Sequence, residues 1–115
     1  MRVDEQSRSP DEQAHIAALV DVAKKMIAGE LGPIAGARKI LELQYDVGDS
    51  ENDVFLPFVG IWSEADTLVV GDRSLFADEY LERVDREYAD YDERLRPSIG
   101  DCCRALLDVF EPRLT

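Results

Sequence analysis

The feature that most constrains this chain is a seven-residue repeat of apolar side chains in its last third. The repeat consists of Ala77, Leu81, Val84, Tyr88, Tyr91 and Leu95. Their separations alternate between four and three residues, which places all of them on one face of an α-helix. The pattern predicts a helix over residues 77–95. Its apolar face packs within the chain or, in a weak homodimer, against a second copy.

Two more helices are predicted before this repeat. Ser9 and Pro10 begin a helix that ends near residue 28, just before Gly29. Serine caps helix N-termini, proline fits the first turn and glycine favours the C-terminal cap. Pro33 begins a second helix over residues 33–46. A short connection between the two predicts an antiparallel helix pair.

Pro97 divides the C-terminal region of the chain. Because proline lacks a backbone N–H and clashes with the preceding turn, it is expected to end or kink the helix of the repeat. A fourth helix is expected between Pro97 and Pro112, with a buried face that includes Cys103, Leu106 and Phe110. Four helices with apolar stripes can assemble a bundle.

The region between the second and third predicted helices, residues 47–76, shows no helical period. Glycines and prolines interrupt it, and its two apolar runs at 58–62 and 67–70 are short. The runs leave open a short β-hairpin with its tip at residues 63–66. The region is therefore predicted to be a long irregular connection, and connections of this length usually have a function or their own packing.

The length of 115 residues suits one domain. We expect a mainly α, four-helix bundle-like domain over residues 9–115 and a flexible tail over residues 1–8. Cys102 and Cys103 are adjacent, which fits a disulfide poorly, so they are expected to be free thiols in a reducing compartment. The N-terminus also lacks the apolar run of a secretory signal. These features predict a cytoplasmic protein.

The charge of the chain is strongly negative. It has 25 Asp and Glu residues against 13 Lys and Arg residues, a formal net charge of −12. Such a charge repels nucleic acid and anionic membranes, so neither is expected as a partner. It favours a basic protein partner. The acids are concentrated in residues 40–72, which contain eight Asp or Glu and no Lys or Arg.

This base-free acidic interval also holds large aromatic side chains. Aromatic residues supply desolvated anchors at protein interfaces, and carboxylates steer a basic partner toward them. The predicted partner-binding residues are Asp49, Glu51, Asp53, Phe55, Trp62, Glu64 and Asp66. The alternative is that the aromatic side chains pin the long connection to the helices.

No metal site or cofactor is predicted. Asp49, Glu51 and Asp53 alternate as the first ligands of an EF-hand do. However, Val54 and Gly60 stand where that motif requires glycine and glutamate. The chain also lacks a lysine-bearing phosphate loop after a strand.

Enzymatic activity is a less favoured alternative. It would use the carboxylates of Glu64 and Asp66, with Trp62 as one wall of an apolar pocket. Such a pocket is needed to raise the pKa of a carboxyl group into the working range of a general acid.

Three stretches resemble short uncharacterised bacterial proteins: GELGPIAGARKILEL, LPFVGIWSEAD and EYADYDERLRPSIGDCCRALL. The resemblance covers residues 29–110 and implies no particular chemistry. In size and acidity the chain is also similar to bacterial immunity proteins, which neutralise secreted toxins by capping a basic active site. That resemblance implies binding of a basic toxin or effector domain through acidic and aromatic residues.

Overall fold

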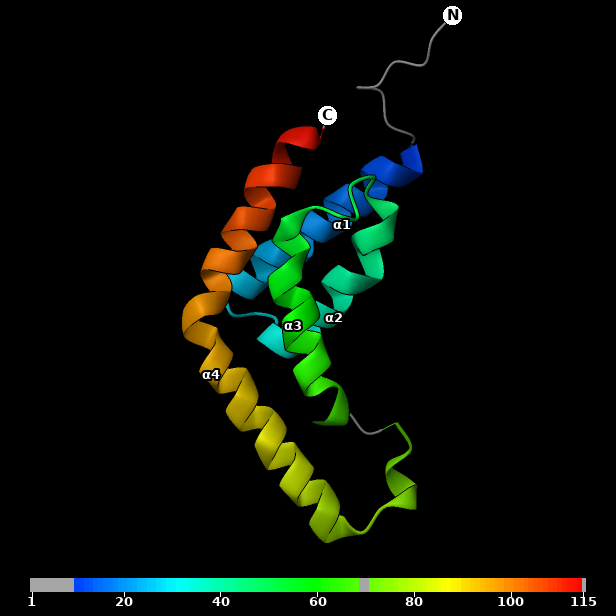
Figure 1. Cartoon of the computed structure of the whole chain (residues 1–115), viewed down its shortest axis with the longest axis vertical. Coiled ribbons are helices and arrows are strands. Elements are labelled where there is room, and N and C mark those ends of the chain that lie inside the picture. Colours follow the sequence, from blue (N-terminus) through cyan, green and yellow to red (C-terminus); the bar gives the residue numbers. More distant parts are fainter. Residues whose placement is uncertain (1–9, 69–70, 115) are drawn as a thin grey trace, which may run out of the picture.

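The protein is described by a computed structural model that covers residues 10–68 and 71–114. These residues form four α-helices and no strand (Figure 1). The helices are α1 (Pro10–Ile27), α2 (Pro33–Leu43), α3 (Leu56–Ala65) and α4 (Asp78–Phe110). The expectation of a mainly α fold is confirmed. The tail predicted over residues 1–8 lies outside the described residues.

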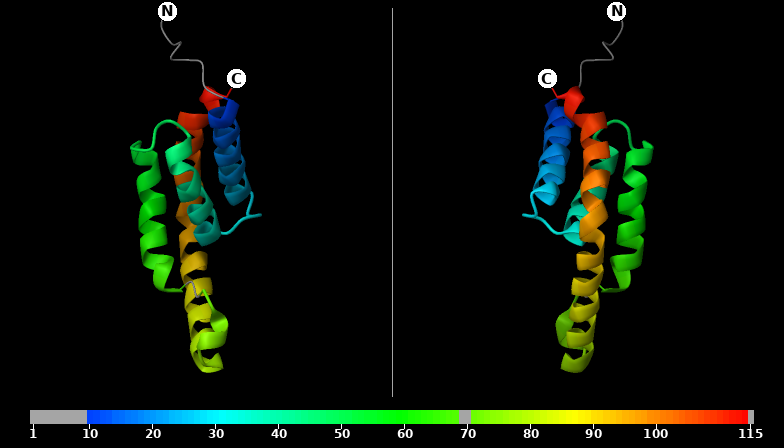
Figure 2. Two further views of the ribbon diagram at one scale, coloured as in Figure 1. Left: turned by 90° about the vertical axis from the view of Figure 1, so that its right-hand side faces the viewer. Right: turned by 90° about the vertical axis from the view of Figure 1, so that its left-hand side faces the viewer.

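The helices α1 and α2 have bounds close to those expected and lie side by side (Figure 2). Gly29 follows α1 with a φ of 81°, the left-handed conformation that favours glycine at a helix end. Gly36 lies where the two helices come close, since a Cβ at this position would overlap the side chain of Met26. The glycine within α2 is therefore explained by the close approach of α1.

The prediction of an irregular connection over residues 47–76 is wrong at its centre, because α3 lies there. The run at 58–62, for which an extended strand was left open, is helical. The other run, at 67–70, lies partly outside the described residues. Pro57 occupies the first turn of α3, where a missing N–H costs no intrahelical hydrogen bond. Gly60 faces open space, so it breaks no packing.

The helical period of α3 is present in the sequence. Phe58, Ile61 and Ala65 recur at three- and four-residue spacing, and all three are buried. Pro57 and Gly60 obscure this period, because proline and glycine usually mark irregular structure.

The third and fourth predicted helices are one continuous helix. α4 spans 33 residues and passes through Pro97, which is exposed. The two halves of α4 run in different directions in Figure 1, as expected for a helix bent at proline. Both halves pack on the same core, Tyr91 and Leu95 before the proline and Ile99 and Cys103 after it. This packing outweighs the cost of about 3 kcal/mol for a proline inside a helix.

The core lies between α1, α2, α3 and the C-terminal half of α4. Ile16, Leu19, Ile34 and Ile40 are fully buried there. Phe55, just before α3, packs against Phe110 near the end of α4, with 5.5 Å between the ring centroids. This contact ties the connection between α2 and α3 to the end of the chain.

The N-terminal half of α4, residues 78–95, is called the arm here. It extends away from α1 in Figures 1 and 2 and gives the molecule an elongated shape of 63 × 30 × 21 Å. The heptad face of the arm turns inward along most of its length. Val84 is 3% exposed, and Tyr88, Tyr91 and Leu95 pack against the core. Packing within the chain therefore covers most of the face that a homodimer would use.

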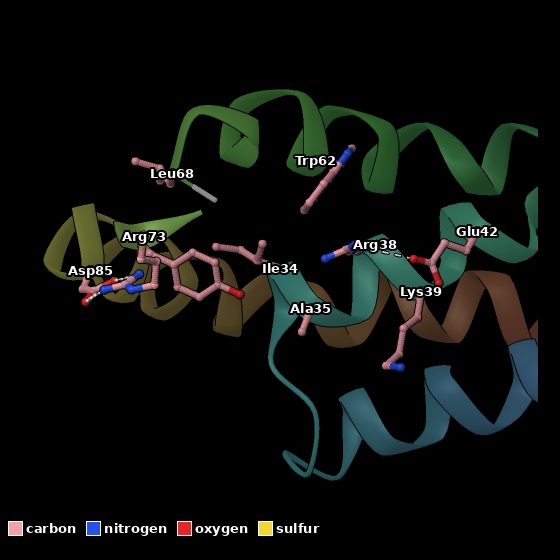
Figure 3. Close-up of a pocket in the computed structure, with 10 residues that line it drawn as sticks. Ile34, Ala35, Arg38, Lys39, Glu42, Trp62, Leu68, Arg73 and Asp85 are labelled. Atoms are coloured by element: carbon pink, nitrogen blue, oxygen red, sulfur yellow. Dashed lines mark hydrogen bonds and ion pairs between the residues drawn. The ribbon is translucent and has the colours of Figure 1, made fainter. Parts of the chain in front are cut away.

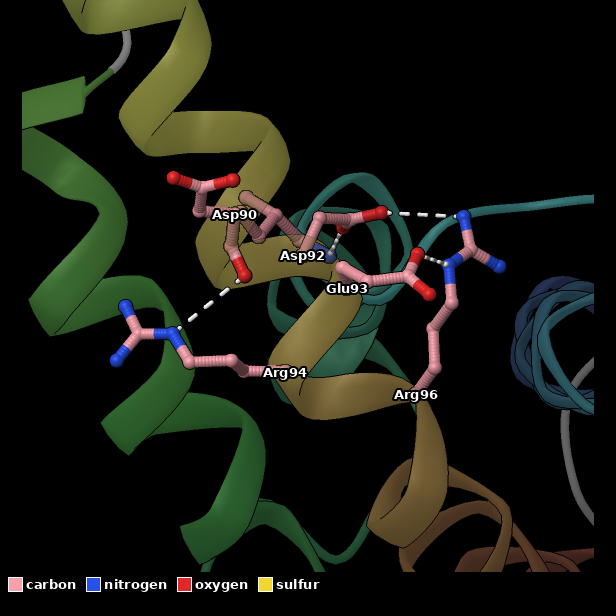
Figure 4. A network of polar contacts seen from close by, with 6 residues as sticks. Asp90, Asp92, Glu93, Arg94 and Arg96 are labelled. Carbon is pink, nitrogen blue, oxygen red and sulfur yellow. Dashed lines mark hydrogen bonds and ion pairs between the residues drawn. The ribbon is translucent and has the colours of Figure 1, made fainter.

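Asp92 connects the arm to α2. Gly32, at the N-cap of α2, has no side chain that could accept a hydrogen bond from the helix. The carboxylate of Asp92 takes over this role and accepts a hydrogen bond from the backbone N–H of Ile34 at 3.0 Å. The same carboxylate pairs with Arg96 at 3.3 Å (Figure 4). The negative charge of Asp92 also suits the positive end of the α2 dipole.

Candidate functional site

An acidic cleft lies where the end of α3 meets the arm. Its volume is about 310 Å³. It is lined by Glu64, Leu68, Glu87, Asp90, Tyr91 and Arg94. Three carboxylates thus face one guanidinium. Their convergence from two helices gives this open cleft a negative formal charge.

The cleft follows from the way α3 and α4 are held. Ala65 is fully buried, which fixes the last turn of α3 and leaves the adjacent Glu64 at the surface. On α4, Glu87, Asp90 and Arg94 are separated by three and four residues and therefore share one side of the helix. Figure 4 shows Asp90 and Arg94 on the side of α4 that faces α3.

Tyr91 joins the two sides of the acidic cleft. Burial, and in second place a hydrogen bond from its hydroxyl to the carboxylate of Glu64, raise the pKa of Tyr91 to about 12. Both causes favour the neutral phenol. Tyr91 therefore stays protonated at neutral pH and can donate a hydrogen bond to the Glu64 carboxylate.

The single cation of this cleft is held by its own helix. The Nε of Arg94 donates to the backbone carbonyl of Asp90 at 3.4 Å, and its guanidinium lies 5.5 Å from the centroid of the Tyr91 ring. No ion pair is recorded between Arg94 and Glu64, Glu87 or Asp90, all of which lie within the described residues. The carboxylates can therefore receive a cation from outside.

The structure separates the residues that the sequence predicted as one binding surface. Asp49, Glu51 and Asp53 precede α3, whereas Glu64 and Asp66 lie at its far end. A helix of 10 residues is about 15 Å long, so the two groups of acids lie at opposite ends of it.

The first group is partly engaged in local contacts. Asp49 pairs with Arg113 at 3.0 Å and accepts a hydrogen bond from the side-chain amide of Asn52 at 2.8 Å. These contacts tie the loop before α3 to the end of the chain. Glu51 and Asp53 are exposed beside it.

The two aromatic residues predicted to contact a partner, Phe55 and Trp62, lie in different surroundings. Phe55 is 1% exposed and belongs to the core, so it offers no surface to a partner. Trp62 is half-buried and lines a separate cleft between α2, α3 and the arm. Phe55 therefore follows the alternative prediction, in which aromatic side chains pack the connection against the helices.

Of the predicted residues, only Glu64 lines the acidic cleft; Asp66 is exposed nearby in the turn after α3. Glu64 is exposed as well, and neither carboxylate has the apolar surroundings that the enzymatic alternative requires. Sequence reasoning missed Glu87, Asp90 and Tyr91 as members of the site. Their common spacing on α4 was visible, but their pairing with Glu64 needs the tertiary fold.

Two other classes of site, a metal centre and a membrane span, are absent from the described ranges 10–68 and 71–114. No group of His, Cys, Asp or Glu side chains there is placed to hold a metal ion. No helix within those ranges is both long and apolar enough to cross a membrane. Comparison of the chain with protein-family models, curated proteins and solved structures found no match.

Proposed function

We propose that this chain is a small cytoplasmic binding protein that occludes a basic surface of a protein partner, in the manner of an immunity protein or antitoxin. Its architecture in this proposal is a four-helix bundle-like domain with a projecting arm. The observation that carries the proposal is the acidic cleft, in which Glu64 of α3 meets Glu87 and Asp90 of α4. The proposed partner is a toxin or effector domain that inserts Lys or Arg side chains into this cleft.

Electrostatics favour such a partner. The formal net charge of −12 attracts a basic surface from a distance and speeds encounter, and the open cleft supplies the short-range contacts. Carboxylates pair well with the planar guanidinium of arginine, which can donate two parallel hydrogen bonds to one carboxylate. Asp66, exposed beside the cleft, and Asp49, Glu51 and Asp53 further away act in steering.

Apolar anchoring is available at the start of the arm. Leu75 is 76% exposed and Phe76 is 44% exposed, and the Phe76 ring stacks on Tyr80 with centroids 5.2 Å apart. Large apolar side chains exposed together suit the desolvated centre of an interface. In this proposal they take the anchoring role that the sequence had given to Phe55.

The test is a charge reversal within the acidic cleft. Basic toxin or effector domains encoded beside the gene are co-expressed with the tagged chain, and captured complexes are measured by calorimetry at two salt concentrations. The triple variant Glu64→Lys, Glu87→Lys, Asp90→Lys is expected to weaken binding at least about tenfold, because like charges then oppose each other.

The matched control reverses Glu30, Asp46 and Asp108, which are exposed outside the cleft. It changes the net charge by the same amount and is expected to retain most of the affinity. Equal loss in both triple variants would show that overall charge, and not the acidic cleft, drives binding. Capture of no basic partner at all would contradict the proposed function itself.

A homodimer through the arm is the second candidate function, as a regulatory or scaffold protein. The exposed Leu75 and Phe76 favour it, although the inward heptad face does not. Light scattering distinguishes a 12.9 kDa monomer from a dimer of twice that mass. A dimer that dissociates on Phe76→Ser would support this candidate, and a monomer at high concentration would remove it.

A further inference from the structure

A second and larger cleft lies between α2, α3 and the arm, and it is called the aromatic cleft here. Its volume is about 440 Å³, within the range of small-molecule sites. Its apolar and aromatic lining comes from Trp62 of α3, Leu68 after α3 and Tyr88 of α4, and the fully buried Ile34 of α2 borders it. Figure 3 shows Trp62 on one side and Ile34 on the other. Three helices thus hold an aromatic slot open to solvent.

The balance of charges around this slot differs from that of the acidic cleft. Arg38, Lys39 and Arg73 line it together with Glu42 and Asp85, so cations outnumber anions. Lys39 stands at the rim with its side chain turned away from Trp62 (Figure 3). Arg38 and Arg73 are balanced by Glu42 and Asp85, so this cleft lacks the excess of carboxylates of a chain whose net charge is −12. An anionic ligand is therefore less repelled here than elsewhere on the molecule.

The two arginines of the aromatic cleft are engaged in different ways. Arg73 uses both terminal nitrogens on the carboxylate of Asp85, at 3.2 and 2.8 Å, which occupies its fork. Arg38 pairs with Glu42 through Nε at 3.3 Å. Its two terminal nitrogens have no recorded partner among the described residues, so they can still bind a carboxylate bidentately.

Arg38 is also placed beside aromatic surface. Its guanidinium lies 5.7 Å from the centroid of the Trp62 ring, and Trp62 is half-buried in the wall of the cleft. A cation over an aromatic face is stabilised by the ring quadrupole, which holds the guanidinium near the slot. A ligand that carries a ring and a carboxylate would meet both features at once.

We propose that the aromatic cleft binds a small planar aromatic carboxylate, with its ring against Trp62 and Tyr88 and its carboxylate on the terminal nitrogens of Arg38. The cleft volume limits the ligand to one of small-molecule size. This role is separate from the binding of a basic protein, since Leu68 is the only one of the described residues that lines both clefts. Arg38 is the residue that selects the charge of the ligand.

The test uses the single tryptophan of the chain as reporter. The indole N–H signal of Trp62 is followed by NMR while naphthalene-2-carboxylate is added, with its uncharged carboxamide and acetate as comparison probes. The carboxylate is expected to shift the signal saturably. The carboxamide is expected to bind at least about tenfold more weakly, and acetate is expected to cause no shift, because one probe lacks the charge and the other lacks the ring.

Two substitutions move the affinity in opposite directions. Arg38→Gln is expected to reduce the affinity for naphthalene-2-carboxylate to that of the carboxamide. Glu42→Gln is expected to raise the affinity, because it removes a competing carboxylate from Arg38. Arg104→Gln, which lies outside the aromatic cleft, is the matched control and is expected to leave the affinity unchanged.

Each contrary outcome overturns the proposal. Equal affinity for the carboxylate and the carboxamide would show that the slot does not select for charge. Such a slot would suit an apolar side chain of a protein partner better than an anionic ligand. No shift of the Trp62 signal with any probe would show that the slot takes no such ligand. Because Arg38 lies outside the acidic cleft, capture of a basic protein by the Arg38→Gln variant tests the proposed function separately.

Discussion

The acidic cleft and the aromatic cleft lie on either side of Leu68 and share the arm as a common wall. One is lined by three carboxylates and one cation beside Tyr91, and the other by three cations and two carboxylates beside Trp62 and Tyr88. Two neighbouring clefts of one chain therefore differ in the balance of charge in their linings. The net charge of the chain predicts the first and gives no indication of the second.

The difference arises from the geometry of α4. Successive residues of a helix are rotated by about 100°, so positions three or four apart share a side and intermediate positions face elsewhere. Asp85 and Tyr88 line the aromatic cleft, whereas Glu87, Asp90 and Arg94 line the acidic cleft beside the end of α3. One helix thus supplies both clefts because α2 and α3 flank it on two sides.

The largest expected effect on stability comes from a substitution that loosens α3, a helix that lines both clefts. Phe58 is fully buried and anchors α3, which contributes Trp62 to one cleft and Glu64 to the other. Phe58→Ala is expected to lower the free energy of unfolding by about 3–5 kcal/mol, because it leaves a cavity in the core. Denaturant unfolding measures the loss.

The matched control is Leu56→Ala on the same helix. Leu56 is 64% exposed, so its truncation is expected to change the free energy of unfolding by less than about 0.5 kcal/mol. A similar loss in both variants would show that α3 is not anchored through Phe58.

A smaller loss of stability is expected from a substitution that affects the aromatic cleft and leaves the lining of the acidic cleft intact. Asp92→Ala removes the cap of α2 and is expected to lower the free energy of unfolding by about 1–2 kcal/mol. Because α2 carries Ile34 and Arg38, the Trp62 indole signal of the aromatic cleft should also move. Thermal or denaturant unfolding and NMR measure the two effects.

Asp90→Ala is the comparison for that variant, two residues away on the same helix. Asp90 is exposed and caps no helix, so its loss should alter the charge of the acidic cleft with little change in stability. Equal destabilisation by the two substitutions would mean that the hydrogen bond from Ile34 contributes nothing.

The smallest effect concerns the tyrosines of the two clefts at alkaline pH. The pKa of Tyr91 is raised to about 12, whereas an unfolded tyrosine titrates near about 10. Because the pKa of Tyr91 is higher in the folded than in the unfolded chain, the neutral phenol stabilises the fold. This stabilisation is complete below pH of about 10 and is lost as the pH rises toward about 12. Stability should therefore fall across that window.

Replacing Glu64 by Gln sharpens the comparison. It removes a charged hydrogen-bond acceptor, so the pKa of Tyr91 should fall but stay above its ordinary value, because burial is the larger cause. Burial and then the charge of Asp92 raise the pKa of Tyr88, which Glu64→Gln should leave unchanged. Phenolate absorbance with Tyr91→Phe and Tyr88→Phe assigns each titration, and an unchanged Tyr91 curve in Glu64→Gln would contradict the contact.

Local sequence signals were sufficient for part of the fold. The bounds of α1 and α2 follow from Pro10, Gly29 and Pro33, since proline and glycine act within one or two residues of a helix end. The predicted helix boundaries were wrong where tertiary packing outweighs the local tendency of proline and glycine to interrupt helices. Pro97 lies inside α4 and Gly60 inside α3, because the flanking apolar residues of both helices are buried in one core.

The candidate sites were predicted less well than the helices. Glu64 and Trp62 were identified from composition, but they line different clefts, and Phe55 is a core residue. The partners of Glu64 in the acidic cleft lie more than twenty residues later in the chain. No periodicity within one segment indicates which face of α4 will meet the end of α3.

The sequence by itself determined that this protein is helical, acidic and built with a long heptad-patterned segment, because these properties depend on residues close together in the chain. Only the tertiary structure decided that this segment turns its heptad face inward, continues through Pro97 and lines two clefts with different balances of charge. The physical reason is that burial is shared among helices. Whether a side chain becomes core, cap or binding surface depends on which distant segment packs against it.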